Sequence, residues 1–462
     1  MTSIQPQRVR RLGPDGDPAG GDFVLYWMQA AVRTTANHAL EFASERANQA
    51  GVPLLVAFVI DPDYPESSLR HHRFLVEGLS SVAPRLERRR AGLRVEIGSP
   101  PQVISRLAGR ATELVTDRGY LRLHREWRQE VADSVVIPTY EVETNLVVPV
   151  EVTSNKQEYA ARTIRPRVHR RLEDYLLEPH EIESAHDGRA LSGGVDPDDH
   201  DRIVEQIDVD PAVPPSARFR GGEEAALENL DRFLEDLVDG YDEARGEPGV
   251  AGTSELSPYL HFGHLSPITV VAAARQATGG SGDGYETLVE ELVVRRELSH
   301  NYTWFQPAYD SYASLPGWAR QTLDDHRHDP RRHIYSTDQL EAAETHDPYW
   351  NAAMTEMRET GYMHNYMRMY WGKQIIFWTE APEAAFETAL YLNNRYFLDG
   401  RDPNSYAGVG WCFGLHDRAW PEREVIGKVR TMTAGGLERK KDMAAYLRRV
   451  EDLTGVKPAG SG

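Results

Sequence analysis

The stretch GTSELSPYLHFG, residues 252–263, lies just inside the second half of the chain and carries its strongest local signal. Gly252 permits a tight turn, and hydroxyl groups follow it closely at Thr253, Ser254 and Ser257. Ser257 precedes a proline, which predicts a helix start with the serine as N-cap and the proline at the first helical position. Hydroxyl groups and free backbone N–H groups at such a start suit a phosphate anion. The stretch therefore predicts an anion-binding loop that leads into a helix.

Helical patterns fill the chain around this loop, whereas strands belong to the first third. Helical spacing of apolar residues covers five segments: 223–241, 267–277, 285–305, 348–379 and 382–398. Strand candidates alternate with helical segments upstream and comprise residues 23–27, 53–60, 93–97, 113–117 and 135–142. Such alternation indicates a doubly wound, mainly parallel sheet, which binds a ligand at the carboxyl ends of its strands.

A segment without clear periodicity separates the two patterns. Residues 179–222 are rich in Gly, Pro, Ser and Asp, which is typical of a linker that is ordered only in part. The predicted fold is therefore an α/β N-terminal domain with a Rossmann-like doubly wound parallel sheet (1–178), an interdomain linker (179–222) and a large all-α C-terminal domain (223–462). This unusual pairing narrows the candidate families.

The composition is that of a soluble globular chain. Hydrophobic residues make up 40% and charged residues 27%, and no apolar run approaches the ~20 residues of a membrane helix. We therefore expect no membrane partner. Cys412 is the only cysteine, which excludes internal disulfides and thiolate clusters, and we expect no metal site. The N-terminus lacks the apolar core of a secretory signal, so we expect the protein to be cytoplasmic. We also expect it to be a monomer.

The charge balance bears on nucleic acid as a partner. The net charge is −19, from 52 basic and 71 acidic residues. This argues against binding to phosphates unless the basic residues are clustered. Residues 162–171 contain five arginines and no acid, and residues 418–441 add seven basic residues, while acids concentrate in 178–243. A DNA partner is therefore compatible with the sequence.

Three further patterns have ordinary structural explanations when each is taken alone. Asp399-Gly400 follows a predicted helix and indicates a turn. Trp350, Trp371 and Trp378 are 21 and 7 residues apart, and tryptophans at helical spacing usually belong to a core. Glu291 begins a helical segment, where an acid is ordinarily a solvated surface residue.

Taken together, these segments resemble the photolyase and cryptochrome family, and within it the class II cyclobutane pyrimidine dimer (CPD) DNA photolyases. The resemblance spans most of the chain and is carried by GTSELSPYLHFG (252–263), MHNYMRMYWGKQII (363–376) and YLNNRYFLDGRDPNSYAGVGW (391–411). It implies a lyase that repairs CPDs in DNA by electron transfer from photoexcited reduced FAD. It also implies that the N-terminal domain can hold a second, antenna chromophore of the deazaflavin type.

The resemblance also assigns roles to single residues. FAD contacts would come from Tyr241, Thr253, Ser254, Leu256, Ser257, Arg368, Asp399 and Gly400. An electron-transfer chain would run from Trp371, nearest FAD, through Trp350 to Trp378 at the surface. The catalytic set would be Glu291, Asn393, Met369 and Trp411. In this set Asn393 would face flavin N5, Glu291 would hydrogen-bond the dimer, and the other two would pack its flipped-out bases. Phosphates near the lesion would contact Arg418, Lys428 and Arg430.

Several features depart from the family pattern. Arg245-Gly246-Glu247 lacks the Asn or Asp expected after the arginine, and Arg295 stands where some members have tryptophan. The stretch 411–418 is one residue shorter than the usual double-glycine form.

Other functions stay open at this point. A cryptochrome-like photoreceptor would bind FAD without repairing DNA, although the short C-terminus and the combination of Glu291, Met369 and Trp411 disfavour it. A dark nucleotide-binding protein would contain no flavin. An enzyme for (6-4) photoproducts would need a pair of histidines at the flavin, and His364 has no second histidine at a suitable spacing.

Overall fold

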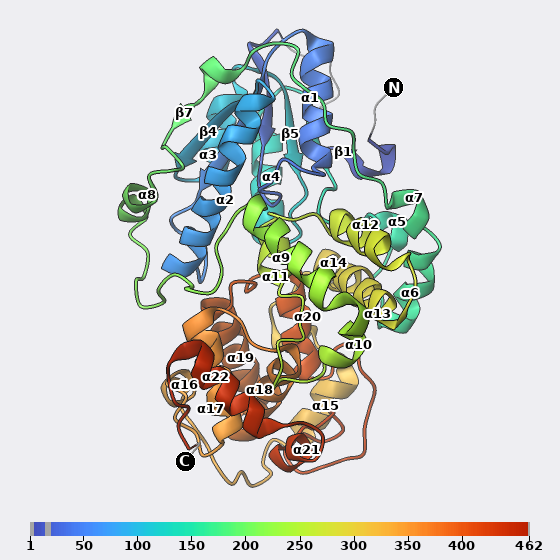
Figure 1. Cartoon of the computed structure of the whole chain (residues 1–462), viewed down its shortest axis with the longest axis vertical. Coiled ribbons are helices and arrows are strands. Elements are labelled where there is room, and N and C mark those ends of the chain that lie inside the picture. Colours follow the sequence, from blue (N-terminus) through green and yellow to red (C-terminus); the bar gives the residue numbers. More distant parts are fainter. Residues whose placement is uncertain (1–3, 14–19, 461–462) are drawn as a thin grey trace.

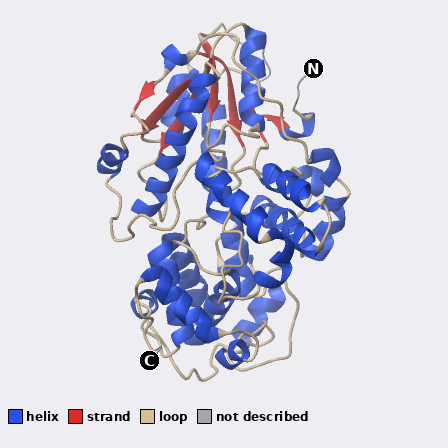
Figure 2. Cartoon of the chain, viewed as in Figure 1, coloured by secondary structure: helices blue, strands red, loops and turns tan. Residues whose placement is uncertain are grey.

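The computed structural model describes residues 4–13 and 20–460. Figures 1 and 2 show an α/β part, which holds all the strands, above a larger part built of helices. The sheet has seven strands in the order β1-β6-β5-β2-β3-β4-β7. Their bounds are β1 Val9–Arg11, β2 Phe23–Trp27, β3 Leu54–Ile60, β4 Gly92–Ile97, β5 Ala111–Asp117, β6 Thr139–Val142 and β7 Gly193–Gly194. All neighbours pair in parallel except β1, which runs antiparallel to β6.

Helices cover both faces of this sheet, and the sequence of its central strands reflects that. Every residue of β2, β3 and β5 is buried, as expected for parallel strands between two helical layers. In β2, Val24 and Tyr26 belong to one apolar core, whereas Phe23, Leu25 and Trp27 belong to the other. The covering helices are α1 His38–Ala50, α2 Leu69–Arg88, α3 Pro100–Ala108 and α4 Arg122–Ser134. The predicted doubly wound sheet is confirmed.

The strand predictions differ from the structure at the edges of the sheet. Neither β1 nor β7 was predicted, because strands of three and two residues carry no periodicity of their own. The segment 135–142 was predicted as one strand, but β6 begins only at Thr139. The preceding Pro138 has no N–H group to donate to a ladder.

Residues 179–222 are more regular than their composition indicates. They contain β7, a 3₁₀ turn (Arg189–Leu191) and helix α8 (His200–Ile207). β7 pairs with β4, and Ile203 and Ile207 of α8 lie in the same apolar core as α2. The division at 178 and 222 stays a prediction.

The helical part contains two large apolar cores. One joins α6 and α7 to α9, α12 and α13, and the other is formed mainly by α15 and α17–α20 with α22. The helices are α5 Val150–Thr153, α6 Ala161–His169, α7 Leu172–Tyr175, α9 Glu223–Asp236, α10 Tyr241–Ala244, α11 Ser257–His261, α12 Pro267–Thr278, α13 Asp283–Val289, α14 Arg296–Phe305, α15 Gly317–Asp325, α16 Thr337–Glu341, α17 Pro348–Thr360, α18 Asn365–Trp378, α19 Pro382–Tyr396, α20 Pro403–Cys412, α21 Ala434–Glu438 and α22 Met443–Thr454. Among the described residues, no helix has the length and apolar character needed to cross a membrane.

Local signals explain how two of the predicted segments divide. Segment 348–379 becomes α17 and α18, because Gly361 takes a left-handed conformation (φ 79°) and His364 caps the second helix by accepting from Tyr366 N. Segment 285–305 becomes α13 and α14 with a π-helical turn, Glu290–Arg295, between them. The predicted N-cap at Ser257 is wrong. Leu256 already has helical angles, so α11 starts at Ser257 itself without a side-chain cap.

Candidate active site

A cavity of about 650 Å³ lies within the helical part, which we call the main cavity. Its volume falls within the roughly 300–1,000 Å³ typical of cofactor and ligand sites. The predicted site residues on its lining are Tyr241, Thr253, Ser254, Leu256, Ser257, Glu291, Arg368, Met369, Trp371, Asn393, Asp399, Trp411 and Arg430. Gly400 does not line it: a Cβ there would lie 2.9 Å from carbonyl oxygens of α19, so this glycine serves a close backbone approach. The structure therefore brings together residues that are far apart in the sequence.

The hydroxyl-rich loop forms one wall of the main cavity. Thr253 Oγ1 accepts a hydrogen bond from the Tyr362 hydroxyl at 2.9 Å, and Asn229 Nδ2 donates to the Ser254 carbonyl at 2.9 Å. Glu255, the next residue, has a positive φ of 55° and forms an ion pair with Arg218. These contacts fix the loop, so that the hydroxyls of Thr253, Ser254 and Ser257 line the main cavity.

An arginine–aspartate pair lies on another wall. Arg368 Nη2 on α18 donates to Asp399 Oδ1 at 3.0 Å and to Oδ2 at 3.3 Å. Ser405 Oγ donates to the Asp399 carbonyl at 2.7 Å and holds the backbone of the aspartate. The Arg368 guanidinium also stacks 3.7 Å above the centre of the Phe397 ring. The pair is thus held by packing and by hydrogen bonds.

Asn393 and Trp371 add two buried polar groups to the same lining. Asn393 is 2% exposed, and its Nδ2 donates to Asn394 Oδ1 at 3.0 Å. The Trp371 indole is 1% exposed, and its Nε1–H has no hydrogen-bond partner in the described part of the chain. A buried N–H group without a partner is costly, which favours a ligand with an acceptor beside it.

The three predicted tryptophans are in mutual contact, in the expected order. The rings of Trp371 and Trp350 are stacked at 6.5 Å between centroids, and Trp350 meets Trp378 edge to face at 5.5 Å. Trp350 Nε1 donates to the Trp371 carbonyl at 3.0 Å. The placement of Trp378 at the surface is wrong, because its ring is 5% exposed. Its outer edge is covered by Tyr335 and His346.

Glu291 lies in the π-helical turn rather than in a regular helix. Its Oε1 is 3.1 Å from Arg245 Nη2, and both side chains line the main cavity. π-Turns inside helices occur frequently at functional sites. Arg245 was not predicted as a site residue. Its spacing of four residues from Tyr241 was the available signal, because this spacing places two side chains on one helix face.

Two of the three cations predicted to bind DNA flank the ring of Trp420, a residue that was not predicted as part of a site. Arg418 and Arg430 place their guanidinium carbons 5.0 and 4.5 Å from the Trp420 ring centroid. Trp420 N donates to the Lys428 carbonyl at 2.8 Å. All three cations are exposed, and only Arg430 lines the main cavity. Alternation of arginines with an aromatic ring is typical of nucleic-acid surfaces.

His364 is part of the scaffold. Its Nδ1 accepts from Tyr366 N at 3.2 Å at the start of α18, and its ring is fully buried. His364 is absent from the lining of the main cavity, whereas its neighbours Met363 and Asn365 belong to it.

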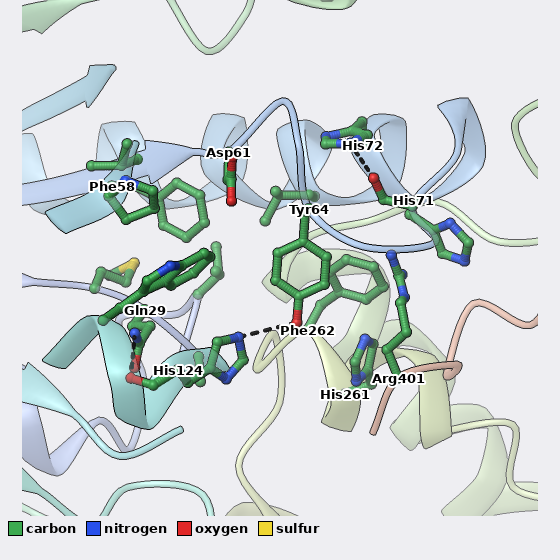
Figure 3. Close-up of a pocket in the computed structure, with 18 of the residues that line it drawn as sticks. Gln29, Phe58, Asp61, Tyr64, His71, His72, His124, His261, Phe262 and Arg401 are labelled. Carbon is green, nitrogen blue, oxygen red and sulfur yellow. Dashed lines mark hydrogen bonds between the residues drawn. The ribbon is translucent and has the colours of Figure 1, made fainter. Parts of the chain in front are cut away.

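A second, smaller cavity of about 120 Å³ lies where the sheet meets the helical part (Figure 3). Trp27 and Phe58 bring the carboxyl ends of β2 and β3 to it, as predicted for a doubly wound sheet. Tyr64 crosses it and its hydroxyl reaches His124 Nε2 at 3.1 Å. Burial lowers the pKa of His124 to about 3, so this histidine is neutral at pH 7. Arg401 is buried, and its Nε has no partner among the described residues.

Comparison with known proteins gives consistent results. A family model for DNA photolyase matches residues 24–185. The chain is 46% identical over 97% of its length to a deoxyribodipyrimidine photo-lyase of Methanothermobacter thermautotrophicus, 99% of which is covered. It is 40% identical over 97% of its length to one from Oryza sativa, with 91% of that protein covered. For one from Potorous tridactylus it is 35% identical over 96%, with 84% of that protein covered.

Solved structures share the fold. A bacterial class III photolyase from Agrobacterium tumefaciens superposes with a TM-score of 0.73 at 19% identity, covering 95% of this chain and 88% of that one. An archaeal photolyase from Sulfolobus tokodaii, solved with two FAD molecules, gives a TM-score of 0.70 at 16% identity, with coverage of 93% and 89%. The class II resemblance of the motifs fits the relatives from Methanothermobacter, Oryza and Potorous named above. The chain belongs to the DNA photolyase family.

Proposed function

We propose that this protein is a light-driven lyase that splits cyclobutane pyrimidine dimers in DNA. The observation that carries the proposal is that one cavity holds both halves of the required site. Arg368, Asp399 and Trp371 line it as candidates for the cofactor, and Glu291 and Trp411 line it as candidates for the lesion. We call Glu291, Met369 and Trp411 the lesion side of the main cavity.

The residues present fit FAD as the cofactor. The Thr253, Ser254 and Ser257 hydroxyls supply donors suited to a pyrophosphate. The partnerless Trp371 Nε1–H supports the presence of a ligand in the same cavity. When bound, reduced FAD supplies a light-excited electron donor. Arg368, held by Asp399, would offer a positive charge to the ring of a reduced flavin bound in this cavity.

The tryptophan chain has the geometry required for stepwise electron hopping. Consecutive ring centroids are separated by 6.5 and 5.5 Å. We propose that, when the cofactor has been oxidised, electrons would pass from Trp378 through Trp350 to Trp371, and that a reductant in solution would replace the electron lost by Trp378. The chain restores the reduced cofactor and takes no part in cleavage of the dimer, which consumes no net electron.

On the lesion side, each residue has a separate task. Trp411 and Met369 offer apolar surfaces for a pair of bases turned out of the duplex. Glu291, oriented by Arg245, can accept a hydrogen bond from the N3–H group of a pyrimidine and so orient that ring. Arg418, Lys428 and Arg430 would hold the flanking phosphates, which offsets the net charge of −19. We further propose that the chain acts as a cytoplasmic monomer, with cofactor and lesion held by residues 223–462.

The second cavity is our candidate for an antenna chromophore of the deazaflavin type. Its aromatic lining and its buried Arg401 suit a planar, anionic pigment. At about 120 Å³ it is below the usual size for such a ligand, so the Tyr64 side chain that crosses it has to move. Uptake of a hydroxylated deazaflavin, followed by fluorescence quenching, should therefore increase in Tyr64→Ala. Absence of uptake by both proteins would reject the pigment.

A repair assay tests the main proposal. The purified holoenzyme is mixed with an oligonucleotide that contains one thymine dimer, and dimer loss is measured in the light and in the dark. We expect loss only in the light. Flavin photoreduction without dimer loss would instead support a cryptochrome-like receptor, and a preparation without flavin absorbance would reject both readings.

A further inference from the structure

Lys373 is a fully buried lysine on α18 that the proposed function does not use. Its side chain is 0% exposed, and no carboxylate in the described part of the chain lies within ion-pair distance of it. A lysine is rarely buried without an acidic partner, because removing an ammonium from water is costly. Its contacts therefore have to compensate for that cost.

Within the described part of the chain, the contacts of the Lys373 ammonium lie on the last turn of α20. Nζ donates to the Cys412 carbonyl at 2.5 Å and lies 3.5 Å from the Trp411 carbonyl. The two carbonyls lie at the C-terminal end of α20, where a cation is favourable, although the Trp411 carbonyl also accepts from Gly414 N at 3.1 Å. Nζ also lies 4.9 Å from the centroid of the Trp411 ring, which is within range of a cation–π interaction.

The packing of the two helices keeps this arrangement narrow. A Cβ added at Gly372, the preceding residue, would lie 2.6 Å from Cys412 Sγ. α18 and α20 therefore approach each other closely beside Lys373, whose ammonium is buried at the end of α20. The Lys373 ammonium also contacts the Trp411 ring, and Trp411 lines the main cavity on its lesion side.

We propose that Lys373 is a positioning residue for Trp411, and that recognition of the lesion requires its ammonium to be charged. The inference rests on the proposed role of Trp411 as a contact for the flipped bases. A neutral amine could still donate hydrogen bonds to these carbonyls, but it would lose the cation–π contact and most of the attraction to the helix end.

The surroundings of Lys373 bring this change within reach of mild alkali. Burial lowers the pKa of Lys373 to about 8, with Arg430 lowering it further and Cys412 and Asp417 opposing the shift. Burial raises the pKa of the Cys412 thiol, so that the thiol stays neutral as Lys373 begins to titrate. Because the pKa of Lys373 is lowered, its charge is complete well below pH 8 and is lost as the pH rises through that value.

The test measures binding in the dark. The dissociation constants of the holoenzyme are compared for a duplex with one thymine dimer and for the same duplex undamaged, between about pH 7 and about pH 10 at constant ionic strength. The ratio of the two constants removes the contribution of the phosphates. We expect this lesion preference to fall about tenfold over the range in the wild type. In Lys373→Met it should be low at every pH, and Lys373→Arg should keep it without the alkaline loss.

A matched control lysine contacts the same helix from outside it. Lys441, between α21 and α22, places its Nζ 5.0 Å from the ring of Tyr366 in α18 and also pairs with Glu247. Lys441→Met should leave both the lesion preference and its pH dependence unchanged. An alkaline loss that persists in Lys373→Arg would overturn the inference, and so would a wild-type preference that is constant across the range.

Trp411→Ala separates this inference from the proposed function. If the alanine variant keeps the full lesion preference, the proposed role of Trp411 is wrong. If it loses the preference while Lys373→Met keeps it, only the inference about Lys373 fails. Should Lys373→Met not fold, the comparison of wild type with Lys373→Arg still decides, because only the wild type should lose its lesion preference in alkali.

Discussion

Glu291 and Arg245 illustrate how single residues set the chemistry of this site. Their side chains are 3.1 Å apart and both line the main cavity, so each restricts the orientation of the other. A carboxylate held in this way can accept a hydrogen bond from a pyrimidine N–H group, because its orientation is already fixed. The π-helical turn that carries Glu291 displaces it from the line of a regular helix.

Replacement of Glu291 tests this role. Glu291→Ala should lower the yield of dimer cleavage per absorbed photon by on the order of tenfold, because a hydrogen bond to a charged group contributes about 1.5–3 kcal/mol. The flavin content should be unchanged. Glu290→Gln is the matched control, since Glu290, which pairs with Arg165 and Arg295, does not itself line the main cavity. Loss of flavin in Glu291→Ala would mean that the residue supports the cofactor instead.

Motif residues could be predicted from the sequence, whereas residues brought in by packing could not. Arg368 and Asp399 are 31 positions apart, and the resemblance assigned both to FAD. In the structure they are joined by a hydrogen bond of 3.0 Å. Trp420 and Lys373 have no signal of this kind. Their importance depends on which rings and carbonyls surround them, and no spacing along the chain encodes that.

At the scale of elements, α17 and α18 carry the tryptophan chain between them. Trp350 on α17 fits between two residues of α18 that are two turns apart. Gly361 makes this possible, because its left-handed conformation reverses the chain and lays the two helices together. The periodic segment 348–379 indicated helix throughout, and the break at Gly361 is a turn signal within it.

The chain makes a prediction that separates photoreduction from repair. In Trp371→Phe, reduction of the oxidised flavin by light should become at least about tenfold slower, because phenylalanine is far harder to oxidise. Chemically reduced enzyme should repair dimers at the wild-type rate. Trp318→Phe serves as a control, since the Trp318 ring contacts none of the three tryptophans. A repair defect in reduced Trp371→Phe would contradict this division of roles.

Elements that rely on distant partners were the ones missed. β7 is two glycines that become a strand only because β4 offers an open edge, and β1 pairs with a strand more than 120 residues away. By contrast, β2 matches the predicted residues 23–27, since a buried apolar run flanked by polar residues signals itself. Local patterns thus predicted the centre of the sheet, and tertiary pairing determined its edges.

At the scale of the whole molecule, an acidic protein presents a basic, aromatic surface beside its main cavity. Arg418 and Arg430 flank the Trp420 ring, and the exposed Lys428 accepts a backbone hydrogen bond from Trp420, although the net charge is −19. Local charge rather than total charge decides whether phosphates are attracted, because salt screens charges that are more than about 10 Å apart.

Salt dependence tests this surface. Affinity for DNA should fall with rising salt, and Lys428→Gln or Arg418→Gln should each reduce the slope of log affinity against log salt by about one. Arg110→Gln should not change the slope, because Arg110 lies on the sheet part and pairs with Asp22. A slope near zero in the wild type would show that phosphates are not bound here.

The central claim is that the main cavity holds a flavin next to a pair of everted pyrimidines. A crystal structure of the holoenzyme with a duplex that contains one thymine dimer tests it most directly. The account predicts a flavin ring between Arg368 and Asn393, with the two bases against Trp411 and Met369 and within hydrogen-bond reach of Glu291. A flavin bound elsewhere, or a dimer that stays stacked in the duplex away from Trp411, would contradict it.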